Sequence, residues 1–415
     1  DLKASFGVTL RVDSSLMAIS CGELVSSTEL DGGRREDTFA DTMVMSTYLV
    51  AFIVGELEAT EAVNVDGVPV RIVHVPGKGA LTGFGLAAAE FSLRWLVDYY
   101  DIPYPAGKLD LIAVPDFAFG AMENLGCITF RETLLLSDPE RTTQAELTRI
   151  VDVIAHEIAH MWFGNLVTMD WWNGIWLKEA FATFMQVATT DAFRPEWRRW
   201  DGFCVERGAA FDTDSLASTR PIEFEVVSPQ DAEAMYDVLT YEKGAAVVRM
   251  LEQFLGIEQF RSGVNHYLTA NSYGNTTTTD LWDSLETATG VPVRAAMDTW
   301  IFQGGHPVIS VETCPEGIKV RQSRFGYGEV GDATWHVPII VRAQVGSKTV
   351  ESRLLLEDSE ATIDLGGTPA WAIVNAGGHG FYRVSYSKVL RDALSGRALD
   401  VLSEAERYGL VDDTW

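Results

Sequence analysis

The sequence predicts a multidomain α+β protein in which two strand-rich regions flank a mostly helical block. The chain has 415 residues, enough for two to four domains that each bury a core. Short runs rich in Val and Thr give way near residue 59 to long helical periods, and alternating strands return after residue 305. Hydrophobic residues make up 47% of the chain and charged residues 22%, as in ordinary folded globular proteins.

Residues 1–58 are expected to be the end of an N-terminal β domain. Short alternating runs fill residues 6–54, and Asp31-Gly32-Gly33 interrupts them as a hairpin turn would. Residues 59–305 are expected to form the central α+β domain. This domain is predicted to begin with a strand, a long amphipathic helix and a second strand, at residues 68–75, 83–100 and 109–114.

Residues 306–386 are expected to form a small β-sandwich of Greek-key or related type. Its strands are predicted at residues 308–311, 318–322, 336–343, 348–356 and 371–375. Residues 387–415 have helical composition and are expected to start a helical domain. Because the chain opens at Asp1 without an initiator Met and stops at Trp415 without a helix cap, we expect a fragment of a longer protein.

The charge balance and the hydropathy of the chain exclude several function classes. Lys and Arg number 32 and Asp and Glu number 59, so the net charge is −27, which repels nucleic acid and anionic membranes. No apolar run reaches the roughly 18 residues of a membrane span. The four cysteines lie far apart in the sequence and are expected to be reduced, buried thiols. We therefore expect no nucleic-acid partner and no membrane span, with a cytoplasmic monomer as the default.

The strongest chemical signal is the run His156-Glu157-Ile158-Ala159-His160. Two imidazoles four residues apart lie only about 40° apart around a helix axis and can hold one ion together. A helix is supported by apolar residues at helical spacing and by a stop at Gly164-Asn165. The apolar face comprises Ile150, Val153, Ile154, Ile158 and Met161.

A hydrolytic zinc ion needs three protein ligands and one open position. Glu179 is the best candidate for the third ligand, because the 18 residues between it and His160 allow a turn at Asn173-Gly174 and a second, returning helix. A carboxylate among the aromatic side chains around it would be costly to bury without a cation. The alternative is a Glu on an exposed helix face. The neighbouring Trp162, Trp171, Trp172 and Trp176 are expected to be core residues.

These residues resemble the zinc aminopeptidases of the aminopeptidase N family, whose pattern is H-E-x-x-H followed after 18 residues by Glu. Gly120-Ala121-Met122-Glu123-Asn124 matches the family's G-x-M-E-N exopeptidase motif. Further similar segments run along the whole chain, at residues 45–49, 241–244, 300–304 and 380–384. The resemblance implies an N-terminal β domain, a thermolysin-like catalytic domain at 59–305, a β-sandwich and a helical domain.

The resemblance also implies a reaction and roles for residues. One zinc ion on His156, His160 and Glu179 would activate a water molecule and polarise the scissile carbonyl, while Glu157 takes the proton and delivers it to the leaving amine. Tyr241 would hydrogen-bond the developing oxyanion; a packed core tyrosine is the alternative. The implied function is hydrolysis of the N-terminal peptide bond of peptides.

Restriction to peptide N-termini requires an anion at a fixed distance from the metal, since only a free α-ammonium satisfies it there. Glu123 fits this role, although the same residue outside the motif would more often lie on the surface. Gly120 and Ala121 would present backbone groups to the substrate as to an added strand. Met122 and Asn124 complete the expected substrate-binding segment, and Met122 with Phe119 would border the side-chain pocket.

The sequence departs from the family at three helical positions. Ile158, Lys178 and Ala180 stand where Leu, Asn and Gly are common, and all three are compatible with a helix. The family also uses a second polar residue from the N-terminal domain on the substrate amine, for which this chain offers no match. Two other functions stay open: a hydrolase of another substrate, similar to leukotriene hydrolase, and a non-catalytic scaffold of the same fold.

Overall fold

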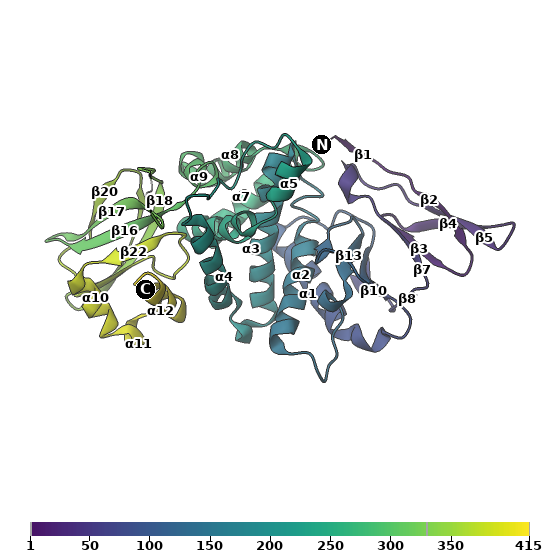
Figure 1. Cartoon of the computed structure of the whole chain (residues 1–415), viewed down its shortest axis with the longest axis horizontal. Helices are drawn as coiled ribbons and strands as arrows, with labels where there is room; N and C mark the ends of the chain where they lie inside the picture. Colours follow the sequence, from purple (N-terminus) through teal and green to yellow (C-terminus); the bar gives the residue numbers. More distant parts are fainter. Residues whose placement is uncertain (1, 329–330, 415) are drawn as a thin grey trace. The chain divides into compact units, whose positions relative to one another are not determined.

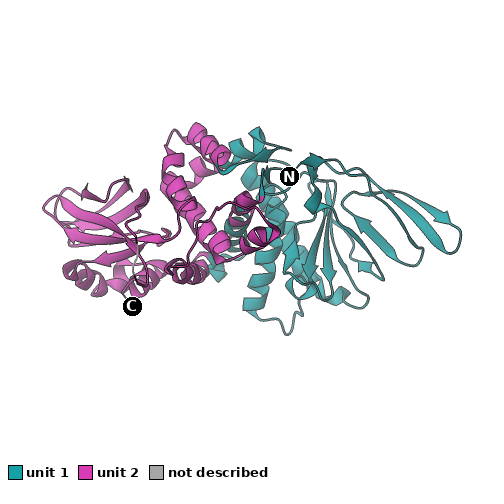
Figure 2. Ribbon diagram, turned by 45° about the horizontal axis from the view of Figure 1, so that its top comes forward, with its two compact units in different colours: residues 1–171, 181–199, 264–278 teal, residues 172–180, 200–263, 279–415 magenta. Residues whose placement is uncertain are grey.

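The computed structural model describes residues 2–328 and 331–414, which form two compact units (Figure 2). The first unit contains residues 1–171, 181–199 and 264–278, and the second contains residues 172–180, 200–263 and 279–415. Strands come first, helices with a mixed sheet follow, and strands return before the last helices. This order confirms the multidomain α+β class. Asp1 and Trp415, on which the expectation of a fragment depends, lie outside the described residues.

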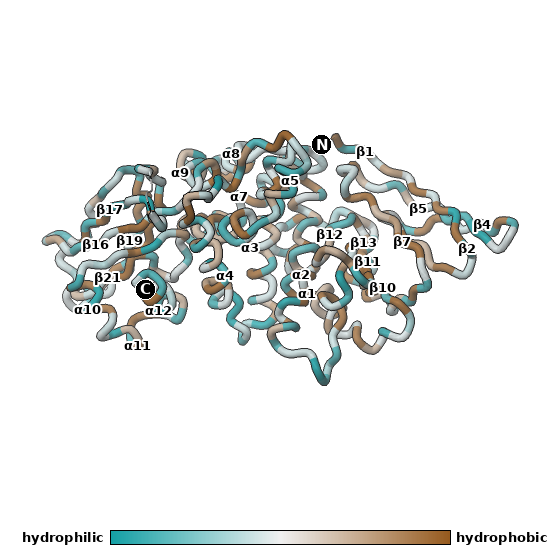
Figure 3. The backbone as a smooth tube through the Cα atoms, in the orientation of Figure 1, coloured by the Kyte–Doolittle hydropathy of each residue, from teal (hydrophilic) through white to brown (hydrophobic). Residues whose placement is uncertain are grey.

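The first unit begins with antiparallel strands, as the alternating pattern predicts. A three-stranded sheet has the order β2-β5-β4, and two pairs, β3 with β7 and β1 with β6, accompany it. Strands β4 and β5 carry mostly hydrophilic residues (Figure 3). The strands are β1 (Lys3–Ala4), β2 (Thr9–Asp13), β3 (Met17–Ser20), β4 (Leu24–Leu30), β5 (Arg34–Phe39), β6 (Met45–Ser46) and β7 (Phe52–Gly55).

A six-stranded mixed sheet with the order β12-β13-β11-β10-β8 follows, and β9 pairs with β10 as well. Strands β10, β11 and β13 are parallel, whereas β12 runs antiparallel to β13 at the end of the sheet. The central strand β11 is an almost continuous buried run, as expected where both faces are covered. The strands are β8 (Glu58–Ala59), β9 (Val63–Val65), β10 (Val68–His74), β11 (Leu109–Val114), β12 (Ala121–Met122) and β13 (Cys127–Arg131).

Helices α1 (Gly83–Tyr100) and α2 (Gln144–Ala159) lie beside this sheet and beside each other (Figure 1). Helix α1 begins and ends where the sequence predicts. Helix α2 starts with a capping box, in which Thr143 and Glu146 each bind the other's backbone N–H, which satisfies orphan donors of the first turn. A short parallel pair, β14 (Thr168–Met169) with β15 (Asn275–Thr276), completes the strands of the first unit.

The remaining helices of the central block follow the helical periods of the sequence. They are α3 (Ile175–Phe193), α4 (Arg199–Asp214), α5 (Pro229–Ala234), α6 (Gly244–Leu255), α7 (Ile257–Ala270), α8 (Thr278–Thr289) and α9 (Val293–Ile301). In the core of the first unit, Phe163 and Phe181 stack with their ring centroids 4.3 Å apart. Trp162, Trp172 and Trp176 are at least partly buried, but Trp171 is 53% exposed. The core prediction for Trp171 is therefore wrong, because this residue lies at the polar turn just before α3.

The second unit ends in two sheets with the orders β20-β17-β16-β22 and β19-β18-β21. All five strands predicted here are present: residues 348–356 match β19 without a shift, and the other four strands have shifted ends. One pair, β16 with β22, is parallel. The strands are β16 (His306–Thr313), β17 (Gly317–Phe325), β18 (Val337–Val345), β19 (Lys348–Leu356), β20 (Glu360–Asp364), β21 (Trp371–Val374) and β22 (Arg383–Tyr386).

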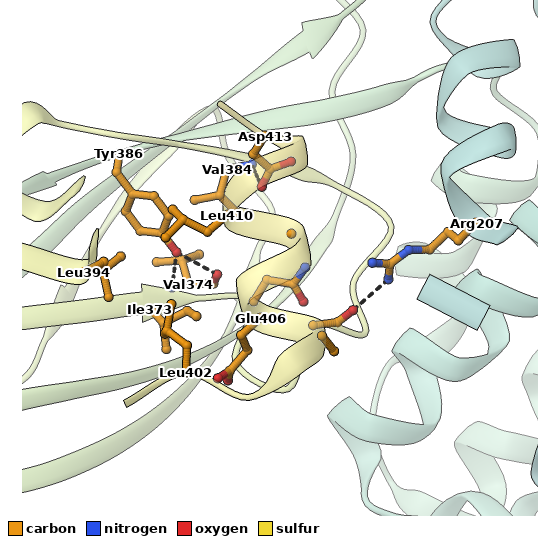
Figure 4. A pocket seen from close by; sticks show the side chains of 14 residues that line it. Arg207, Ile373, Val374, Val384, Tyr386, Leu394, Leu402, Glu406, Leu410 and Asp413 are labelled. Atoms are coloured by element: carbon orange, nitrogen blue, oxygen red, sulfur yellow. Dashed lines mark hydrogen bonds between the residues drawn. The ribbon is translucent and has the colours of Figure 1, made fainter. Parts of the chain in front are cut away.

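Helices α10 (Lys388–Ser395), α11 (Ala398–Val401) and α12 (Glu404–Asp412) close the chain, as its composition predicts. A cavity of about 20 Å³ between them and the sheets is large enough for a single water molecule (Figure 4). The Tyr386 hydroxyl lies at this cavity and bonds the backbone N–H and C=O of Val374. Among the described residues, no helix is both long and apolar enough to cross a membrane.

Candidate metal centre

The last turn of α2 carries the H-E-x-x-H residues. Its regular hydrogen bonding extends to the C-cap, since the His160 N–H donates to the His156 carbonyl at 3.1 Å. Both imidazoles are therefore on one face of the helix, and their ring centroids lie 4.6 Å apart. His156, Glu157 and His160 are all buried. The helix begins at a strong cap and packs against α1, so a rigid element holds these side chains.

The two imidazoles turn the same ring nitrogen toward each other. Nδ1 of His156 lies 3.0 Å from Oε1 of Gln186, and Nδ1 of His160 lies 2.9 Å from the carbonyl oxygen of Phe163. Because these oxygens only accept, each Nδ1 carries the proton and each Nε2 keeps its lone pair. The two Nε2 atoms are 3.0 Å apart. Two lone pairs at that distance repel each other unless a cation accepts both of them.

Glu179 lies on α3 with its side chain buried; the residue is 4% exposed. Ligand atoms of Glu179, His156 and His160 all lie within 4.8 Å of one another. An exposed helix-face Glu, the alternative from sequence, is therefore wrong. Lys178, also buried, places its Nζ 3.0 Å from Oε1 of Glu179.

The donor set fits a zinc ion. Two imidazole nitrogens and one carboxylate are a ligand combination that hydrolytic zinc uses, with a fourth position left open. The Nδ1 contacts match the outer partners that orient metal-bound histidines and fix their tautomers. Burial of Glu157 and Glu179 close to the paired imidazoles adds acidic groups that a divalent cation would stabilise.

The segment Gly120–Asn124 comes to the same place from the sheet. Strand β12 pairs Ala121 with Phe130 and Met122 with Thr129, and the chain turns after Met122. Glu123 follows at this turn and is 3% exposed. Ligand atoms of Glu123, Glu157 and His160 lie within 4.8 Å of one another. The alternative interpretation, that Glu123 is a surface residue, is therefore wrong.

Two asparagines hold this turn. Nδ2 of Asn165, just after α2, donates to the Glu123 carbonyl at 3.0 Å. Oδ1 of Asn124 accepts from the Thr129 hydroxyl at 2.9 Å. Asn165 therefore joins the end of the histidine helix directly to the turn that carries Glu123. Sequence reasoning treated Asn165 only as a helix stop.

The edge of the sheet beside Glu123 suits an extended ligand. Strand β12 is the last strand in its sheet, so its outer edge is the place where a strand could be added. Phe119 precedes it and is 75% exposed. The Arg131 guanidinium donates to the carbonyls of Phe117 and Ala118, which fixes the loop that presents the Phe119 ring.

Tyr241 lies in the second unit, on a π-helical turn, η6 (Leu239–Lys243), and is half-buried. Such turns are rare and frequently occur at functional sites. Next to it, burial raises the pKa of Glu242 to about 7, and the negative charges of Glu206 and Asp237 add to this. Lys243 is buried with its Nζ 2.8 Å from Oδ2 of Asp214.

The described contacts bring together five of the residues singled out from the sequence: Glu123, His156, Glu157, His160 and Glu179. Sequence reasoning missed Gln186 and the role of Asn165. The only signal for Gln186 was its position, seven residues after Glu179 on the same helix, which is two turns along the same face.

A helix that presents two converging imidazoles, with an acid beside them and another opposite, is the arrangement of a metal-dependent peptidase. Comparisons with known proteins agree. The Peptidase family M1 domain matches residues 84–300, and the Peptidase M1 N-terminal domain matches residues 1–49. The chain belongs to peptidase family M1, as its motifs predict.

Several curated relatives are similar over essentially the whole chain. Aminopeptidase M1-A of Oryza sativa subsp. japonica is 39% identical over 422 residues, which cover 100% of this chain and 48% of the relative. Puromycin-sensitive aminopeptidase of Caenorhabditis elegans is 40% identical, with 99% and 45% covered. Alanine/arginine aminopeptidase of Saccharomyces cerevisiae is 39% identical, with 100% and 48% covered. The chain spans about half the length of the curated relatives it matches.

Proposed function

We propose that this protein is a zinc-dependent aminopeptidase that hydrolyses the N-terminal peptide bond of peptides. The observation that carries the proposal is the convergence of two Nε2 lone pairs, 3.0 Å apart, with the carboxylate of Glu179. The names of the relatives, all aminopeptidases, agree with it. We assign His156, His160 and Glu179 as ligands of one zinc ion.

A zinc ion bound there would supply Lewis-acid polarisation of the scissile carbonyl and a lowered pKa of water. We assign Glu157 as the general base. Its carboxylate accepts a proton from the attacking water and passes it to the leaving amine. We assign Tyr241, from its motif, as the hydroxyl that donates to the developing oxyanion. Removal of one such donor costs about 100- to 1000-fold in kcat.

We assign Glu123 as the group that binds the free α-ammonium of the substrate. Its carboxylate is buried in the cluster with Glu157 and His160. A substrate whose N-terminus is blocked or extended would lose this charge-assisted hydrogen bond to Glu123, which is worth about 1.5–3 kcal/mol. Gly120, Ala121, Met122 and Asn124 form the strand edge along which the substrate backbone would lie.

The proposal is tested with an aminoacyl anilide and its N-acetylated twin, before and after chelation. We expect hydrolysis of the free amine only, its loss on chelation and its return with zinc. Equal cleavage of both substrates would defeat the exopeptidase assignment, and chelator-resistant cleavage would defeat the metal assignment. A lipid epoxide assayed in parallel separates the leukotriene-hydrolase-like alternative, and a scaffold would cleave none of them.

Variants assign the individual roles. Glu157→Gln is expected to lower kcat by about 100- to 10,000-fold while zinc content stays unchanged. Glu123→Ala is expected to lower kcat/KM for the free amine without affecting zinc. Glu140→Gln, at an exposed site before α2, is the matched control and should behave as the wild type. Loss of zinc in Glu157→Gln would contradict the separation of ligand and base.

The remaining assignments extend this proposal. We propose a division into residues 1–58, 59–305, 306–386 and 387–415, as the sequence predicts. Peptides with a free N-terminus are the proposed partners. A monomeric state and a cytoplasmic location stay predictions, which gel filtration and fractionation of the host cell would test.

A further inference from the structure

Two of the four cysteines, 106 residues apart in the sequence, lie side by side in the first unit. Cys21 follows strand β3 and Cys127 is the first residue of β13. Their Sγ atoms are 4.0 Å apart. Cys21 is 4% exposed and Cys127 is fully buried. Nothing in the spacing of the sequence indicates this pair, and neither thiol belongs to the metal centre.

The backbone around the pair is held close. Gly126 has φ +68°, and a Cβ at this position would come within 2.5 Å of the Cys21 carbonyl oxygen. The Lys108 ammonium donates to the Gly126 carbonyl at 2.9 Å and to Oδ2 of Asp110 at 2.8 Å. A glycine that permits close approach and a buried lysine that binds its carbonyl together keep the two thiols adjacent.

The two thiols are not equivalent. The Cys127 S–H donates to Cys21 Sγ, and this hydrogen bond lowers the pKa of Cys21 to about 7 against the opposing effect of burial. The nearby Lys108 charge acts in the same direction. The same hydrogen bond and burial raise the pKa of Cys127. This arrangement favours the nucleophilic thiolate at Cys21 and the protonated thiol at Cys127.

We propose that Cys21 and Cys127 form a peroxide-responsive dithiol that closes to a disulfide. The Cys21 thiolate attacks hydrogen peroxide, which leaves a Cys21 sulfenic acid and hydroxide. The Cys127 sulfur then displaces the hydroxyl group of this sulfenic acid, its proton leaves with that group as water, and the S–S bond forms. In total, two thiols and one peroxide give one disulfide and two waters. A small oxidant suits the site because the pair is almost closed to solvent.

Closure requires the sulfurs to approach from 4.0 Å to about 2 Å, which we expect from rotation of the side chains and a shift of the Cys21 segment. It would also disturb the turn that carries Glu123. The Leu49 carbonyl lies near Cys21 Sγ at 3.6 Å and near Nδ2 of Asn124 at 3.5 Å. Because Cys21 Sγ and Asn124 Nδ2 both lie against the Leu49 carbonyl, a movement of Cys21 is expected to shift this carbonyl and Asn124 with it. This functional consequence, a reversible change in KM for free-amine substrates, rests on the proposed function.

The test is titration of the reduced protein with hydrogen peroxide, followed by intact mass and peptide mapping. We expect a loss of about 2 Da and a peptide pair linked through Cys21 and Cys127, reversed by dithiothreitol. Cys204, whose pKa is raised by burial, and the more exposed Cys314 are internal controls and should stay reduced at the same dose. Modification of Cys314 first, with no 21–127 link, would overturn the proposal.

Variants order the two steps. Cys127→Ser should stop at a Cys21 sulfenic acid that dimedone traps, whereas Cys21→Ser should leave Cys127 reduced. Cys204→Ser, at another buried site, is the matched control and should still form the link. Dimedone labelling of Cys127 in Cys21→Ser would overturn the assigned order. Because the link is read by mass, it succeeds or fails independently of peptidase activity. A link that forms without any change in KM would overturn only the coupling to the Glu123 turn.

Discussion

Gln186 offers a way to perturb the proposed metal centre without touching a ligand. Its Oε1 accepts the Nδ1 proton of His156 at 3.0 Å. The corresponding partner of His160 is the backbone carbonyl of Phe163, which no side-chain substitution removes. Gln186→Leu therefore removes the Nδ1 acceptor of one imidazole and leaves that of the other in place. Without this acceptor the His156 ring is oriented less firmly, and it can also exchange the proton between Nδ1 and Nε2.

Loss of such an outer partner typically weakens metal binding by about 10- to 100-fold, equivalent to about 1.4–2.8 kcal/mol. We expect the lower half of this range, because only one of two imidazoles loses its acceptor and the helix still holds its backbone. Gln186→Glu should keep or tighten zinc binding, since a carboxylate in the same position accepts the same proton and makes the imidazole a better donor.

Zinc affinity is measured by competition with a chromophoric chelator at fixed pH, which needs no activity. Gln230→Leu, at an exposed site in α5, is the matched control for the loss of a glutamine. A dissociation constant for Gln186→Leu within twofold of the wild type, in a variant with an unchanged unfolding transition, would refute the argument. The Nδ1 contact would then have no role in orienting the ring for a metal.

Three further changes follow from buried charged groups. Lys178→Asn is expected to tighten zinc binding in the same assay, because the Lys178 ammonium competes for the carboxylate of Glu179; weaker binding would contradict this. Lys243→Met should cost about 3–5 kcal/mol in chemical denaturation by stranding the buried Asp214 charge, and adding Asp214→Asn should restore most of it. Glu242 has a pKa raised to about 7 by burial, so the stability it contributes is complete below about pH 4 and is lost as the pH rises through 7; Glu242→Gln should flatten that decline between pH 5 and 8.

Much of the fold was predictable because its elements follow strong local patterns. The limits of α1 and β11 match the sequence because an unbroken amphipathic period determines α1 and an apolar run, interrupted only by Asp110, determines β11. Strand ends in the last two sheets shifted by up to three residues, since register with neighbours extends a strand beyond its apolar stretch. Trp171 was misplaced because large aromatic side chains are usually buried, whereas this one lies at a turn.

The proposed metal ligands could be predicted from the sequence, but the residues that orient them could not. His156, His160 and Glu179 are recognisable because few residue types bind zinc and helical spacing brings two of them together. The adjacency of Cys21 and Cys127 was not predictable, because it depends on how the N-terminal strands meet the central sheet. Neither the hydrophobic period nor the residue spacing of a single sequence indicates how these strands pack against the sheet.

The residues that orient the proposed metal ligands cannot be recognised from the sequence, for a physical reason. Orienting an imidazole requires only an oxygen that accepts one hydrogen bond, and this need is met by an amide side chain at Gln186 and by a backbone carbonyl at Phe163. Asn165 joins the helix to the Glu123 turn through a carbonyl that any residue would supply. The metal constrains the identity of its ligands, whereas the fold constrains only the position of the atoms behind them. Substitutions that keep an acceptor in place should therefore be tolerated at Gln186, while none should be tolerated at His156.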